Sequence, residues 1–164
     1  MNGSKGSYAI AGAVSKYESD GKKIMERWSD RYQVQPMRAD RIFGRAHLIS
    51  SYLHAERAFR QERNRSSNLM TEALLFASFN RQISKAIELL GVNGQKEIAL
   101  LIHPSIGDEE LDEQLSSVGL VRDDTVIEIT AEKLKEMELL GIRCDVKEAE
   151  KAVLQKIALS YIDI

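Results

Sequence analysis

The chain has 164 residues, of which 43% are hydrophobic and 29% are charged, and this is enough to bury a substantial core. Its single cysteine, Cys144, excludes an intrachain disulfide and a zinc site made of cysteines, and favours a reducing cytoplasm. No stretch of the sequence approaches the length of a membrane span, and residues 1–7 lack the apolar core of a signal peptide. We therefore expect a cytoplasmic protein with a disordered tail over residues 1–7 and a single domain over residues 8–164.

The net charge of -2 conceals an uneven distribution of charge. Residues 1–85 hold fifteen lysines and arginines against eight acids, whereas residues 86–164 hold eight against seventeen. Seven of the arginines lie between Arg38 and Arg65, where no lysine occurs. A basic half with clustered arginines favours contact with a polyanion, although charge runs are about as often plain solvated surface.

The first elements expected along the chain are two strands with a helix between them. Residues 8–14 have the pattern of a strand, in which Gly12 marks a bulge or a close approach of another backbone. A short helix around Trp28 follows, and we interpret this tryptophan as a core residue rather than a stacking platform. Residues 33–38 fit an edge strand, because Pro36 cannot donate a hydrogen bond to a neighbouring strand.

A long helix is expected over residues 45–62, where apolar residues recur every three or four positions. His47 and His54 are seven residues apart in it, too far for a metal-binding pair, so we interpret both as ordinary half-buried or surface histidines. Four arginines crowd the end of this helix and the loop after it: Arg57, Arg60, Arg63 and Arg65. One or two would complement the negative end of the helix, but four exceed that need. They are therefore candidates for a phosphate-binding patch on a flexible loop.

Residues 69–91 form the longest segment with helical periodicity in the chain. Its apolar stripe is expected to be core and contains Ala73, Phe76, Ile83, Ile87 and Leu90. Ser78 or Asn80 would cap a second helix, and Gly91 would end it. We expect two consecutive buried helices with a polar corner, at which Arg81 faces RNA or a partner and Gln82 serves the helix start or a backbone group.

The second half of the chain continues the alternation of strands and helices. Residues 97–102 are almost continuously apolar, which is typical of an interior strand. The acids at 108–113 indicate a helix start, residues 125–129 a fourth strand, and residues from 130 to Gly141 another helix. The prediction is a mixed α/β fold, with a small mixed sheet of about four strands (residues 8–14, 33–38, 97–102 and 125–129) covered by helices.

The last helix is expected over residues 145–161, and the chain from residue 157 onwards is apolar on all sides. An exposed apolar end of this kind usually marks a surface that binds a partner. The alternative is that the end packs into the protein's own core. The candidate partner-binding residues are Leu154, Ile157, Ala158, Tyr161 and Ile164.

The sequence contains no convincing catalytic constellation. The nucleotide-binding motifs G-x-x-x-x-G-K-[ST] and G-x-G-x-x-G and the nucleophile motif G-x-S-x-G are absent. The acids after Cys144 disfavour its thiolate, and His103 ends a strand without an identifiable partner. We expect a protein that is not an enzyme and that has no cofactor and no metal.

Three segments resemble the PRPK-binding-protein (TPRKB, or Cgi) family. Residues 72–78 read E-A-L-L-F-A-S, and residues 81–91 read R-Q-I-S-K-A-I-E-L-L-G. The other two segments are Ala39-Asp40 with the following Gly44 and His47-Leu48, and residues 152–159, which read A-V-L-Q-K-I-A-L. The similarity runs from Tyr8 over nearly the full length, and it departs at Phe79-Asn80, where relatives often have glycine and a polar residue.

The resemblance implies a non-catalytic subunit of the KEOPS (EKC) complex, which makes threonylcarbamoyladenosine next to the anticodon of tRNAs that read codons beginning with A. Family members bind the small atypical kinase/ATPase of that complex and help to recruit tRNA, including its single-stranded 3′ end. The other KEOPS subunits would be contacted indirectly, and the short form favours an archaeal source.

On this basis the expected tRNA-binding residues are Arg57, Arg60, Arg63, Arg65 and Arg81, and the expected kinase-binding residues are those of the C-terminal helix. An adaptor that regulates the kinase without touching RNA is the alternative. An enzyme that uses His103 is a weaker third.

Overall fold

The computed structural model describes residues 8–162, and for residues 161 and 162 it describes the backbone alone. The described chain forms two compact units. The first contains the residues up to Ala39 together with Gly91–Ile127, and the second contains Asp40–Leu90 together with the residues from Glu128 onwards. The chain therefore passes between the units at three points, and a single domain over residues 8–164 stays a prediction.

The first unit is built on a four-stranded sheet in the order β2-β3-β1-β4. The strands are β1 (Ala9–Ser15), β2 (Gln33–Arg38), β3 (Glu97–His103) and β4 (Leu120–Arg122). β3 is interior because its apolar run is buried on both faces, and β2 lies at an edge, as Pro36 requires. The mixed α/β class and the small helix-covered sheet are confirmed, although every strand pair is antiparallel.

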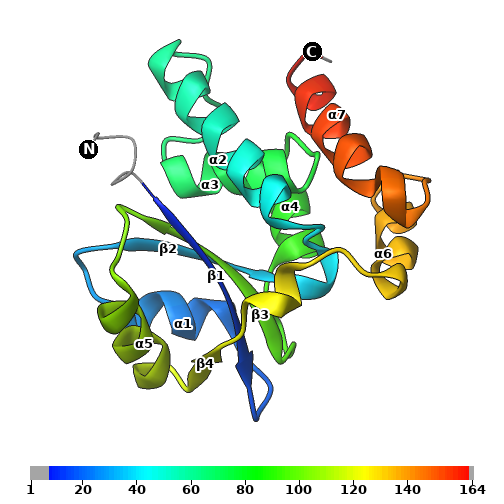
Figure 1. The fold of residues 1–164 in the computed structure, drawn as a ribbon. Coiled ribbons are helices and arrows are strands. Elements are labelled where there is room, and N and C mark those ends of the chain that lie inside the picture. Colours follow the sequence, from blue (N-terminus) through cyan, green and yellow to red (C-terminus); the bar gives the residue numbers. More distant parts are fainter. Residues whose placement is uncertain (1–7, 163–164) are drawn as a thin grey trace. The chain divides into compact units, whose positions relative to one another are not determined.

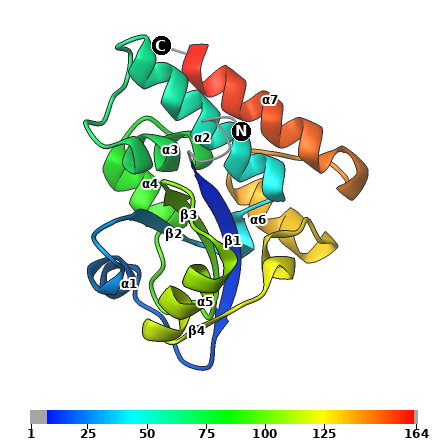
Figure 2. The same cartoon turned by 60° about the vertical axis from the view of Figure 1, so that its left-hand side comes forward.

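Two helices, α1 (Gly21–Arg27) and α5 (Asp108–Ser117), pack on one face of this sheet (Figures 1 and 2). The pairing of β1 with β3 places Ala11 opposite Leu100, and both side chains belong to the core cluster on this face of the sheet. From the helices, Ile24, Trp28, Leu111 and Leu115 enter the same cluster. Trp28 is therefore a core residue, as predicted.

The fourth strand lies earlier in the chain than predicted. β4 ends at Arg122, and Asp124–Ile127 forms a 3₁₀ helix instead of the strand expected at residues 125–129. The carboxylate of Asp123 accepts the N–H of Thr125 at 3.0 Å, and this turns the chain out of the sheet. Val126 and Ile127 are buried from within the 3₁₀ turn, so tertiary burial overrode the strand propensity of this β-branched run.

Gly12 permits a close approach of two backbones, as the sequence predicted. A Cβ at Gly12 would lie 2.5 Å from the carbonyl oxygen of Asp123, and the Gly12 N–H donates to Oδ1 of Asp124 at 2.9 Å. We expect Gly12→Ala to lower the free energy of unfolding by about 1–3 kcal/mol, because the two backbones must separate. Urea unfolding measures the effect, with Gly107→Ala as control, since a Cβ at Gly107 meets nothing within 4 Å. Equal losses in both variants would contradict the prediction.

The second unit is helical. Its helices are α2 (Arg45–Arg60), α3 (Leu69–Ala77), α4 (Ile83–Leu90), α6 (Leu134–Leu139) and α7 (Ala149–Ile162), with 3₁₀ turns at Ala131–Lys133 and Val146–Glu148. α3 and α7 both contact α2, and α7 runs alongside α2 in Figure 2. The expected long helix, the two consecutive central helices and the C-terminal helix are confirmed.

The polar corner between α3 and α4 is organised by Asn80. Its Oδ1 accepts the N–H of Gln82 at 3.1 Å, and the carbonyl of Gln82 accepts the N–H of Ala86 at 2.9 Å as α4 begins. Gln82 thus serves the helix start through its backbone. Phe79 has a φ of 59°, a left-handed conformation that glycine would adopt without strain.

Candidate interaction surfaces

The start of α2 is organised around the fully buried side chain of His47. Its Nδ1 accepts the N–H of Phe43 at 3.0 Å, so the proton is on Nε2, which donates to the carbonyl of Ala77 at 2.9 Å. The ring is stacked between Phe43 and Phe79, with centroid distances of 5.4 Å on both sides. Burial lowers the pKa of His47 to about 4, so the ring is neutral at pH 7. His47 joins α2 to α3 and is not the half-buried or surface histidine that the sequence suggested.

Arg41 shows that part of the arginine cluster has a structural role. Its Nη1 donates to the carbonyl of Leu89 at 2.8 Å, and its Nε pairs with Glu136 at 2.7 Å. Nearby in sequence, the carbonyl of Ile42 accepts a hydrogen bond from Nζ of the buried Lys133 at 2.8 Å. These cations join the segment before α2 to α4 and to the 131–139 region, so Arg41 is not available to a polyanion.

The arginines at the end of α2 are arranged differently. Arg57 and Arg60 occupy its last turn with exposed side chains, and neither has an ion pair or hydrogen bond to another described side chain. Arg63 follows in a tight turn, in which Glu62 has a φ of 55° and the Arg63 N–H donates to the carbonyl of Ala58 at 2.8 Å. The structure therefore brings Arg57, Arg60 and Arg63 to one end of α2.

The loop after this turn is held by the buried carboxylate of Glu72. Oε1 of Glu72 accepts the N–H of Arg65 at 2.9 Å and that of Ser66 at 2.7 Å. Asn68 then caps α3 by accepting the N–H of Thr71 at 3.0 Å. The loop expected to be flexible is thus anchored, and the half-buried Arg65 takes its position from the anchor.

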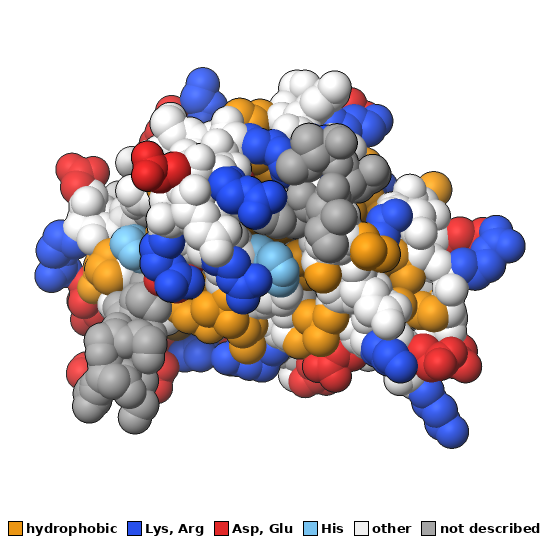
Figure 3. Space-filling view, turned by 90° about the horizontal axis from the view of Figure 1, so that it is seen from above, with side chains coloured by type: hydrophobic (Ala, Val, Ile, Leu, Met, Phe, Trp, Pro, Cys, Tyr) orange, Lys and Arg blue, Asp and Glu red, His pale blue; other side chains and the backbone are white. Residues whose placement is uncertain are grey.

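Arg81, the fifth arginine of the predicted RNA site, lies apart from this end of α2 in the corner before α4. Its side chain is half-buried, and its Nη2 is buried without a hydrogen-bond partner among the described residues. That nitrogen is not open to a phosphate from solvent. Arg81 is accordingly a weaker candidate than the four arginines at the end of α2, which we call the arginine group (Arg57, Arg60, Arg63 and Arg65). On the face seen in Figure 3, several Lys and Arg side chains lie beside hydrophobic side chains.

One row of α7 is buried, which corrects part of the predicted partner surface. Ala149, Val153 and Ile157 recur every four residues and are at most 1% exposed. Because this row packs inside the second unit, Ile157 is a core residue and its assignment as a partner anchor is wrong.

The other candidate residues of α7 lie off this row. Leu154 and Ala158 are half-buried, while Leu159, which is not among the predicted partner-binding residues, is 61% exposed. The side chain of Tyr161 and the whole of Ile164 lie outside the described residues.

A second apolar surface lies on α4, where the sequence predicted core. Ala86 and Leu90 face inward and are fully buried, but Ile83 and Ile87 are 41% and 54% exposed. The short helix buries only the row that contains Ala86 and Leu90. Ile83 and Ile87 form the neighbouring exposed row, and we call these two residues the α4 row. Two large exposed apolar side chains one turn apart are a candidate partner-binding feature, which periodicity alone would assign to the core.

Two further kinds of feature are not found among the described residues. Residues 8–162 contain no group of three or more His, Cys, Asp and Glu side chains that could hold a metal ion. No helix in this range is long and apolar enough to cross a bilayer. The candidate surfaces for a macromolecular partner in the second unit are the arginine group and the two apolar surfaces.

The comparison with protein families identifies the class. The family model described as kinase binding protein CGI-121 matches residues 14–160. This match covers most of the chain, which therefore belongs to the CGI-121 family of kinase-binding proteins. The resemblance to the PRPK-binding-protein family is thereby confirmed. No curated protein matches the chain.

Proposed function

We propose that this chain is a non-catalytic subunit of the KEOPS complex, where it holds the small atypical kinase and recruits tRNA for threonylcarbamoyladenosine synthesis. Membership in a family of kinase-binding proteins supports the kinase half of the proposal. The tRNA half is carried by the arginine group, whose exposed members Arg57 and Arg60 lack ion pairs within the described chain. Binding to the 3′ end is proposed from the resemblance, and a cytoplasmic location from the single cysteine.

The arginine group suits a phosphate backbone for two physical reasons. Arg57 and Arg60 are one helical turn apart, so their guanidinium forks can contact neighbouring phosphates without moving the helix. The Glu72 anchor holds the backbone of Arg65 in place, so less conformational entropy is lost when RNA binds. A preformed site of this kind favours RNA over the alternative of a purely protein-binding adaptor.

The kinase would dock on the apolar surfaces of the second unit. The α4 row (Ile83 and Ile87) supplies large side chains that gain most from burial, and Leu159 extends the exposed apolar surface of α7 beside Leu154 and Ala158. A kinase is the occupant that the family description names.

Replacing Arg57, Arg60 and Arg65 by alanine is expected to weaken tRNA binding and to flatten its dependence on salt. For every phosphate that is no longer bound, the slope of log affinity against log salt should fall by about 0.7–0.9. Fluorescence titrations of tRNA between low and physiological salt measure both quantities. The same titration with a tRNA that lacks its 3′ end locates the part of the RNA that is bound. Weaker binding of this tRNA than of intact tRNA by the wild-type chain would assign the contact to the 3′ end.

The matched control removes the same charge elsewhere in the second unit. Arg143, Lys147 and Lys151 are exposed, and their replacement by alanine lowers the net charge by the same amount. If this control loses as much affinity as the arginine variant, binding depends on net charge and the site assignment fails. If tRNA does not bind the wild-type chain or the assembled complex, the adaptor without RNA contact is the better function.

A further inference from the structure

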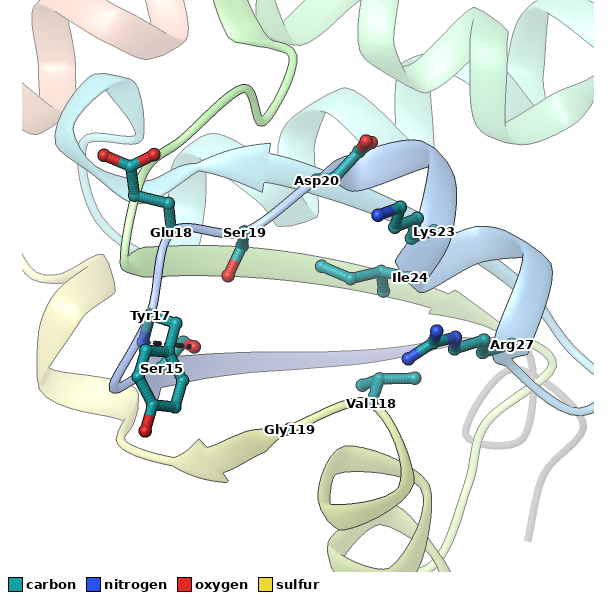
Figure 4. A pocket seen from close by; sticks show the side chains of 10 residues that line it. All are labelled: Ser15, Tyr17, Glu18, Ser19, Asp20, Lys23, Ile24, Arg27, Val118 and Gly119. Carbon is teal, nitrogen blue, oxygen red and sulfur yellow. Dashed lines mark hydrogen bonds between the residues drawn. The ribbon is translucent and has the colours of Figure 1, made fainter.

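We propose that a cavity in the first unit binds a phosphate group carried by a small molecule. The cavity has a volume of about 220 Å³ and lies between α1 and the segment that leads into it from β1 (Figure 4). Ser19, Lys23 and Arg27 contribute polar atoms to it, and Ile24 and Val118 contribute apolar surface. The cavity is smaller than typical drug-binding sites of about 300–1,000 Å³, which suits a compact ligand.

The charge inside the cavity is positive. Lys23 and Arg27 are one turn apart on α1, and Figure 4 shows the ends of both side chains directed into the cavity. Neither has an ion pair or hydrogen bond to a described side chain. Two cations one turn apart on the same helix can both contact one anion. The arginine fork and the lysine ammonium are the usual partners of a phosphate dianion.

The carboxylates at the rim do not neutralise these cations. Glu18 and Asp20 both border the cavity, but in Figure 4 their carboxylates point away from it. Asp20 is in addition occupied as the cap of α1, since its Oδ1 accepts the N–H of Lys22 at 2.9 Å. The sign of the charge therefore selects an anion rather than a metal ion.

The frame of the cavity is held in place by backbone hydrogen bonds. Ser19 donates its N–H to Gln95 at 3.2 Å and accepts the N–H of Gly94 at 2.7 Å, so the segment before α1 is fixed to the loop before β3. The Ser19 hydroxyl points into the cavity in Figure 4, where it can donate to a phosphate oxygen.

Tyr17 stands at the edge of the cavity with 77% of its surface exposed. Its ring offers a flat face on which an aromatic group can stack. The chemical class that fits both the cations and the ring is a phosphomonoester with an aromatic ring, such as a nucleoside monophosphate. This proposal is independent of tRNA binding at the arginine group, which lies in the other unit.

Calorimetric titrations of the full chain with AMP, inorganic phosphate and adenosine test the proposal. AMP is expected to bind, phosphate to bind more weakly, and adenosine not to bind measurably. Lys23→Ala and Arg27→Ala should each weaken AMP binding about tenfold or more, because each removes a charged hydrogen bond. Both side chains are exposed, so the variants retain the fold.

Lys22→Ala is the matched control, because Lys22 is an exposed cation of the same helix that does not line the cavity. It should leave AMP binding unchanged within about twofold. Absence of AMP binding at millimolar concentration, equal binding of adenosine, or an equal loss in Lys22→Ala would overturn the proposal. A 5′-phosphorylated trinucleotide that binds much more tightly than AMP would assign the cavity to RNA and likewise overturn it.

Discussion

Replacing both residues of the α4 row, Ile83 and Ile87, by aspartate is expected to abolish capture of the kinase while the chain remains folded. The two side chains are 41% and 54% exposed, so charges there cost the free chain little. In a complex each isoleucine, already about half-buried, would gain about 0.7–1.5 kcal/mol from burial of the rest of its side chain, and an aspartate would in addition bury an unpaired carboxylate. Together these effects predict a loss of affinity of at least about a hundredfold. Pull-down and calorimetry with the purified kinase measure it.

Two further variants separate docking from folding. Leu139→Asp is the control, because Leu139 is 68% exposed on α6 of the same unit. This variant should bind the kinase normally. Leu159→Asp tests α7 and should weaken binding if that helix shares the contact. Undiminished kinase binding by the Ile83→Asp/Ile87→Asp variant would remove the α4 row from the interface. If only Leu159→Asp then fails to bind, docking is confined to α7, as the C-terminal apolar residues suggested.

The second large effect is a loss of stability on acidification that depends on His47. The pKa of its buried ring is about 4 in the folded chain, against 6.5 for an exposed histidine, because burial disfavours the charged form. Between these two values the unfolded chain binds a proton that the folded chain does not bind. The contribution of His47 is therefore complete above about pH 6.5 and falls by about 3 kcal/mol as the pH drops to 4.

The measurement is urea unfolding of the wild-type chain and of His47→Gln between pH 4 and pH 7. His47→Gln should be less stable at pH 7, since Phe43 and Ala77 lose well-aligned partners, but its stability should fall less steeply with acid. His54→Gln is the control, because it removes the half-buried second histidine of α2 and leaves the hydrogen bonds of His47 in place. Identical slopes for the wild-type chain and His47→Gln would show that this ring does not control the pH dependence.

Much of the fold could be predicted from local pattern. The side chains of residues 98–102 are all apolar, so this strand must be buried on both faces of the sheet. Pro36 excludes β2 from the interior of the sheet. The fourth strand was misplaced because Thr125, Val126 and Ile127 have strand propensity, whereas Asp123 and the approach to Gly12 impose a turn.

The interaction surfaces were predicted less completely than the elements that carry them. The position of Arg57 and Arg60 at the end of α2 could be predicted from the sequence, and their role in binding stays a prediction. The contrasting role of Arg41 could not be recognised, since its partners Leu89 and Glu136 are distant along the chain.

The sequence by itself determined the element order, the class of fold, the family and the concentration of arginine at the end of α2, because each depends on local spacing or residue type. Only the tertiary structure decided which apolar residues remain for a partner. The periodicity of α4 and α7 is the same for a core row and an exposed row, and what separates Ile87 from Ile157 is whether other helices cover it. The buried state of His47, the anchoring of the arginine loop by Glu72 and the cavity beside α1, which Val118 also lines, likewise depend on residues that are brought together only by folding.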